Sequence, residues 1–141
     1  MIRENTVDHI TITIPRGMIL TDNNRHHYYA KARGTADLRL MGYRAWIDAG
    51  RPKHHRVKVL VSIDYPDRRK REASNLNLTI KALVDGMVSG VYKPTSGGYM
   101  LPDDDDTHLI GPWPLASGSL SPKRGGQGTY TFHFQIEEIP A

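Results

Sequence analysis

The chain has 141 residues, which is enough for one domain with a hydrophobic core. It is 38% hydrophobic and 24% charged with a net charge of +4, as expected for a soluble globular protein that favours polyanionic partners. Cysteine is absent, which excludes disulfides and thiolate zinc sites, and no run of about 18 apolar residues is available to span a membrane. The N-terminal residues contain no segment of signal-peptide type, so we expect a cytoplasmic protein.

The hydrophobic pattern predicts four strands and two helices. Strands are predicted where apolar residues recur at every second position, and helices where they form a stripe at every third or fourth. In chain order, the predicted elements are a strand over residues 9–14, a helix over 35–49, a strand over 57–65, a helix over 76–88, a short strand from 107 to 110 and a strand over 129–136. This β-α-β-α-β-β order predicts an α+β fold: a single small domain, residues 1–141, with one mixed sheet and two helices.

Segments rich in Gly, Ser and Pro interrupt this pattern. Residues 92–100 have no periodicity and are interpreted as an inserted loop, and residues 116–128 as a flexible loop. The short strand from residue 107 is expected to stop near Pro112 and Pro114. Gly42 weakens the prediction of the first helix, because glycine is a poor helix former.

Four consecutive aspartates, Asp103 to Asp106, stand out in a chain that is otherwise basic. Adjacent like charges repel, whereas carboxylate oxygens are the preferred ligands of hard cations such as Mg²⁺ or Mn²⁺. Glu72 precedes the second predicted helix and the aspartates follow it, so both could reach one rim of the sheet. One or two Mg²⁺ ions held there would promote phosphodiester hydrolysis. The alternative is a surface glutamate and a solvated acidic turn.

A second set of candidates lies on the second predicted helix. Lys81 and Asp85 are four residues apart and therefore share one face of that helix, which begins near Asn75. A lysine in this position could stabilise the charge that develops on a phosphate in the transition state. The alternative is an exposed ion pair that contributes about 0.3–0.5 kcal/mol.

Basic and aromatic residues form two candidate DNA contacts. One is the run of four cations at residues 68–71, directly after the second predicted strand. The other is the segment that contains Asn24, Arg25 and His27, in which Asn, Arg, His and Tyr side chains could contact phosphates and stack on unpaired bases. A plain surface loop is the alternative for that segment. Zinc binding is disfavoured, because the histidines occur in adjacent pairs that cannot easily both reach one ion.

Taken together, these segments resemble the RusA-like Holliday junction resolvases, small homodimeric endonucleases common in phages and prophages. Four stretches carry the resemblance, in the order of the family. They are Asn23-Asn24-Arg25 with nearby His27, Tyr65-Pro66-Asp67-Arg68-Arg69-Lys70-Arg71, Glu72-Ala73-Ser74-Asn75-Leu76 leading to Lys81-Ala82-Leu83-Val84-Asp85-Gly86, and Leu101-Pro102 with the aspartates.

The resemblance implies a Mg²⁺-dependent endodeoxyribonuclease, with Mn²⁺ as a possible substitute, that resolves four-way or other branched DNA as a homodimer in recombination and repair. The implied catalytic residues are Glu72, Lys81, Asp104, Asp105 and Asp106. The carboxylates of this set would bind the metal, and Asp85 could add another. The implied DNA-binding residues are Asn24, Arg25, His27, Arg68, Arg69, Lys70, Arg71 and Asn75.

Three positions depart from the family's pattern. Glu72 and Ser74 stand where the family has aspartates, and Lys81 lies about one helical turn further from Asn75. One alternative is therefore a junction-binding protein whose catalytic site has decayed. A structural or regulatory Ca²⁺ protein is a further alternative, although the chain lacks the Asp-x-Asp-x-Asp-Gly spacing of an EF-hand loop.

Overall fold

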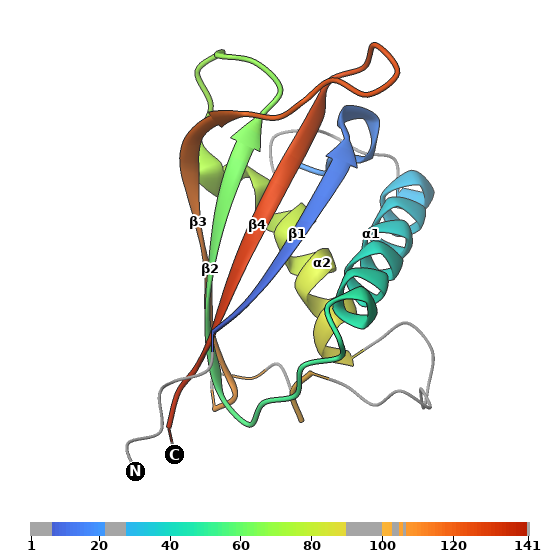
Figure 1. Ribbon diagram of the computed structural model, residues 1–141. Coiled ribbons are helices and arrows are strands. Elements are labelled where there is room, and N and C mark those ends of the chain that lie inside the picture. Colours follow the sequence, from blue (N-terminus) through green and yellow to red (C-terminus); the bar gives the residue numbers. More distant parts are fainter. Residues whose placement is uncertain (1–6, 22–27, 90–99, 103–104, 106, 141) are drawn as a thin grey trace.

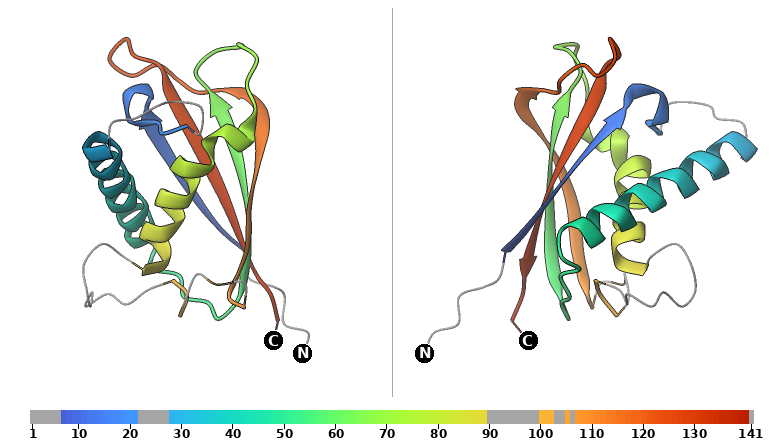
Figure 2. Two further views of the ribbon diagram at one scale, coloured as in Figure 1. Left: turned by 180° about the vertical axis from the view of Figure 1, so that it is seen from behind. Right: turned by 45° about the vertical axis from the view of Figure 1, so that its right-hand side comes forward.

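A four-stranded mixed sheet with two helices on one face forms the fold (Figures 1 and 2). The computed structural model describes residues 7–21, 28–89, 100–102, 105 and 107–140. Its elements are β1 (Val7–Pro15), the 3₁₀ turn η1 (Arg16–Met18), α1 (Tyr28–Asp48), β2 (Val57–Tyr65), the 3₁₀ turn η2 (Ala73–Leu76), α2 (Asn77–Ser89), β3 (Leu109–Leu120) and β4 (Thr129–Glu138). The predicted α+β class and the β-α-β-α-β-β order are confirmed.

The strand order is β1-β4-β2-β3, so β1 and β3 are the edges of the sheet. Strand β4 pairs antiparallel with both β1 and β2, whereas β2 and β3 run parallel. Parallel neighbours need a crossover connection, and α2 provides it. Helix α2 consequently begins near the end of β2 and ends near the start of β3 (Figure 1).

The alternating residues of the strands form the core against the helices. On β2, Val57, Val59, Val61 and Ile63 are all at most 1% exposed, and the aromatic residues of β4 lie beside them. From the helices, Leu38, Trp46 and Leu83 are completely buried. Every second residue of β2 therefore faces the helices, and the residues between them face the open side of the sheet.

The two helices cross at a pair of glycines. A Cβ on Gly42 of α1 would lie 3.0 Å from the Cα of Leu83, and a Cβ on Gly86 of α2 would lie 3.0 Å from the Cα of Arg39. Both neighbours are backbone atoms, so the helices approach this closely only because neither position has a side chain. Gly42, which weakened the sequence prediction, is the residue that lets α1 pack on α2.

Strand β3 corrects two predictions. It runs from Leu109 to Leu120 and does not stop near Pro112 and Pro114, and residues 116–120 belong to it and not to a flexible loop. Prolines are tolerated because β3 is an edge strand that pairs only with β2. The remainder of the predicted inserted loop, residues 92–99, lies outside the described residues, whereas Met100 is buried.

The helix boundaries also differ from the predicted ones. Helix α1 begins at Tyr28, seven positions before the predicted start, and α2 follows a 3₁₀ turn and begins at Asn77. Among the described helices, none is both long and apolar enough to cross a membrane.

Candidate functional site

The predicted basic run forms the turn that follows β2. Residues 68–70 are exposed, whereas Arg71 turns back toward the sheet. Its Nη1 donates to Asp67 Oδ1 at 2.6 Å, and its guanidinium carbon lies 5.3 Å from the ring centre of Tyr65 and 5.8 Å from that of Tyr130. The run therefore contains one anchored cation and three that face solvent.

The electrostatics of this turn follow from the Asp67–Arg71 pair. The hydrogen bond from Arg71, together with one from the backbone N–H of Arg69, lowers the pKa of Asp67 from 3.8 to about 2. The same side-chain bond raises the pKa of Arg71, and burial raises the pKa of Tyr65. Arg71 is thus a fixed charge that shapes the turn, whereas residues 68–70 are exposed and Arg69 Nε lies 3.7 Å from Asp67 Oδ2.

Four predicted site residues meet in one pocket beside this turn. The pocket measures about 270 Å³ and is lined by Lys70, Arg71, Glu72 and Asn75, with the rings of Tyr65 and Tyr130 among its other walls. Glu72 is exposed, and its carbonyl oxygen accepts the backbone N–H of Asn75 at 3.1 Å. The structure therefore brings Glu72 together with predicted DNA-binding residues at the end of β2.

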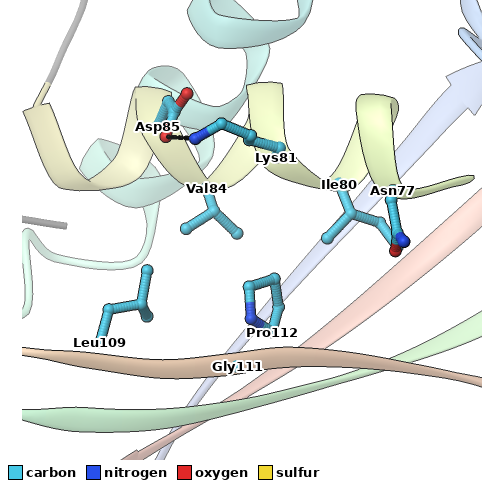
Figure 3. Close-up of a pocket in the computed structure, with 8 residues that line it drawn as sticks. All are labelled: Asn77, Ile80, Lys81, Val84, Asp85, Leu109, Gly111 and Pro112. Carbon is cyan, nitrogen blue, oxygen red and sulfur yellow. Dashed lines mark hydrogen bonds and ion pairs between the residues drawn. The ribbon is translucent and has the colours of Figure 1, made fainter. Parts of the chain in front are cut away.

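Lys81 and Asp85 line a second pocket, between α2 and β3 (Figure 3). Lys81 Nζ lies 3.4 Å from Asp85 Oδ1, and the lysine side chain is 69% exposed. The pocket measures about 290 Å³, and Asn77 lies at one end of it. Its apolar walls are Ile80, Val84, Leu109 and Pro112. A charged pair above an apolar floor could position a phosphate group beside a partly buried nucleotide.

Of the aspartates predicted to bind metal, Asp105 lies among the described residues, whereas Asp104 and Asp106 do not. Asp105 is exposed, and its Oδ1 accepts the backbone N–H of Thr107 at 3.0 Å. Its carbonyl oxygen accepts the N–H of Leu109, the first residue of β3, at 2.9 Å. Asp105 therefore shapes the turn that starts β3, and Oδ2 of its carboxylate has no hydrogen bond among those described.

The structure does not bring Glu72 and Asp105 to one rim, contrary to the prediction. Because β2 and β3 are parallel, Glu72 follows the end of β2 while Asp105 precedes the start of β3. The 13 residues of α2 lie between them, a length of about 20 Å. Asp85 lies toward the end of α2 and shares a pocket with Leu109, so it is the carboxylate on the side of Asp105. No group of three possible metal ligands occurs within the described residues.

Three predicted DNA-binding residues are not described by the structure, and the roles of two further residues were not predicted. Asn24, Arg25 and His27 lie outside the described residues. Sequence reasoning placed Asp67 in the basic motif at the end of a strand but did not predict that it anchors Arg71. It also overlooked Trp113, which is exposed on β3.

Comparison with known proteins does not assign a family. A scan against protein-family models finds no match, and no curated protein is significantly similar to the sequence. The resemblance to RusA-like resolvases therefore depends on the motifs and their order.

Proposed function

We propose that the protein is a Mg²⁺-dependent endodeoxyribonuclease of the cytoplasm that resolves Holliday junctions and other branched DNA as a homodimer. The observation that carries this proposal is the Lys81–Asp85 pair. It lines a pocket between α2 and β3, and β3 follows the acidic run in the sequence. A four-way junction has two-fold symmetry and requires two opposed cuts, which suits an isologous dimer.

The exposed cations at residues 68–70 would hold the DNA backbone. They lie at the end of β2, whereas Leu109 and the Lys81 pocket lie toward its start. The nine residues of β2 span about 26–30 Å, the length of roughly eight base pairs at 3.4 Å each. One DNA arm could therefore contact both the basic turn and the pocket.

Carboxylates toward the end of α2 and before the start of β3 support the proposal of a hard cation, because such ions prefer carboxylate oxygens. Asp85 has a side chain that is 23% exposed, and Asp105 is exposed, with its Oδ1 accepting the backbone N–H of Thr107. Together with Asp104 and Asp106 of the same run, these carboxylates would hold Mg²⁺. A bound Mg²⁺ would supply Lewis acidity for attack of water on a phosphodiester. Lys81 would place its ammonium near the reacting phosphate and stabilise the added negative charge.

Two matched variants test this assignment. Asp85→Asn should reduce cleavage of a four-way junction by about 100-fold, because a carboxylate that would hold Mg²⁺ is lost. Glu72→Gln, which lies at the opposite end of α2, should reduce cleavage less than tenfold. Junction binding in EDTA serves as the control and should be retained by both variants. The reverse ranking would move the site to Glu72.

A second candidate function is junction binding without cleavage. The specific observation in its favour is the separation of Glu72 from Asp105 by the length of α2. Under this alternative, the wild-type protein would bind four-way junctions but leave them uncut in Mg²⁺ and in Mn²⁺.

A further inference from the structure

Strand β3 exposes an unusual amount of apolar surface. Four large apolar side chains are exposed in the described part of the chain, and three of them lie on β3: Trp113 at 48%, Leu115 at 46% and Leu120 at 45%. Large apolar residues gathered on one element commonly mark an interaction surface. Trp113 and Leu115 line neither the Lys81 pocket nor the pocket at the basic turn, residues 68–71.

The register of β3 turns Trp113 and Leu115 away from the helices. Trp113 is paired with Leu60 and Leu115 with Ser62, residues that alternate with the buried positions of β2. The bulge that sets this register is at Gly111, which has a φ of +95°. A Cβ there would lie 2.6 Å from the carbonyl oxygen of Val59, so the position requires glycine. Both apolar side chains consequently lie on the face of the sheet opposite the helices. Figure 2 shows that both helices lie on one face of the sheet.

The same strand leads from this apolar surface to the basic turn. A pocket of about 330 Å³ is lined on one side by Arg68, Arg69 and Lys70 and on the other by residues 116 and 118–120 of β3. Leu60, the partner of Trp113, is five residue steps from Tyr65 at the end of β2, a distance of about 17 Å. A ligand that follows β3 would therefore meet an exposed indole and then three exposed cations.

This combination favours single-stranded nucleic acid over a second copy of the chain. Aromatic rings stack on any unpaired base, and cations hold the phosphates that link the bases. A duplex would engage the cations but would keep its bases away from the indole. Addition of a strand from a second copy is disfavoured, because Pro112 and Pro114 interrupt the donors of the β3 edge.

We propose that Trp113 stacks on an unpaired base of a DNA strand whose phosphates continue to Arg68, Arg69 and Lys70. This inference rests on the proposed function, since it specifies that the branched substrate carries an unpaired segment. Leu115 extends the platform next to Trp113, and Leu120 adjoins the cations.

Intrinsic fluorescence tests the stacking directly. The chain has two tryptophans, and Trp46 is completely buried with its Nε1 bonded to the carbonyl oxygen of Pro52. Quenching on titration with a 16-nucleotide oligothymidine in EDTA therefore reports on Trp113. We expect saturable quenching, and Trp113→Leu should weaken binding by about 5- to 150-fold, the effect of losing one base–aromatic stack. Val7→Ala, at another exposed apolar position, should change affinity less than twofold.

Each contrary result has a distinct meaning. Oligonucleotide binding without quenching, or equal affinity of Trp113→Leu and the wild type, would overturn the stacking inference and leave the proposed function intact. Self-association that Trp113→Leu abolishes, with oligonucleotide binding unchanged, would assign the surface to a second copy. If the wild type binds no single-stranded, duplex or branched DNA, the proposed function fails, and this inference fails with it.

Discussion

Replacing Gly42 with alanine should destabilise the protein, although alanine is the better helix former. A Cβ at this position would lie 2.9 Å from the carbonyl carbon and 3.0 Å from the Cα of Leu83. These atoms belong to the backbone of α2 and cannot rotate away, so the helices would have to separate. Overpacking of this kind costs about 1–3 kcal/mol, and the higher helix propensity of alanine returns at most about 1 kcal/mol. Because the neighbouring atoms are rigid backbone, we expect Gly42→Ala to lower the free energy of unfolding by about 2 kcal/mol.

Gly34→Ala is the matched control on the same helix. Its Cβ would meet the Cδ2 atom of Leu20 at 3.4 Å, an ordinary contact with a flexible side chain. This variant should gain about 0.5–1 kcal/mol from helix propensity. For 141 residues, 1 kcal/mol corresponds to about 3 °C in Tm, so thermal unfolding should show a fall of about 6 °C for Gly42→Ala and a rise of about 2 °C for Gly34→Ala. Equal stability of the two variants would refute the close helix crossing.

Three further predictions concern charge. Arg68→Ala should weaken junction binding and reduce the slope of log affinity against log salt by about 0.9 if it contacts one duplex phosphate, and an unchanged slope would exclude that contact. Because the pKa of Asp67 is lowered to about 2 from 3.8, its stabilising effect should be complete above pH 3.8 and disappear as pH falls through about 2. In urea unfolding, the wild type should be more stable than Asp67→Asn above pH 3.8, and this difference in the free energy of unfolding should disappear near pH 2. A difference that does not change with pH would contradict the prediction. Asp104→Asn with Asp105→Asn should abolish cleavage and leave junction binding equal or tighter, because less negative charge faces the DNA; normal cutting would identify the acidic run as a solvated turn.

The fold class could be predicted because the strong signals are local. Residues such as Val57 and Phe132 recur with the two-residue period that a half-buried strand requires, and they are buried as expected. Strand β3 was underestimated because its prolines and glycines are also typical of loops. Their acceptance depends on the edge position of β3, which is a property of the assembled sheet.

In the candidate site, too, local features could be predicted from the sequence and long-range ones could not. The proximity of Lys81 to Asp85 follows from their spacing on a helix, and they lie 3.4 Å apart. The separation of Glu72 from Asp105 depends on β2 and β3 being parallel, which periodicity alone does not reveal. Asp67, four residues away, anchors Arg71, but the guanidinium carbon also lies 5.8 Å from the ring centre of Tyr130, a residue of another strand that is distant in sequence. The sequence pattern could not predict these two features, because both depend on how distant strands pair in the sheet.

The central claim is tested most directly by incubating the wild-type protein with a labelled four-way junction in Mg²⁺ and, in parallel, in EDTA. We predict paired cuts in Mg²⁺, none in EDTA, and junction binding in both. Cleavage at the same rate in EDTA would contradict metal dependence, and binding without any cut in Mg²⁺ would contradict the nuclease itself.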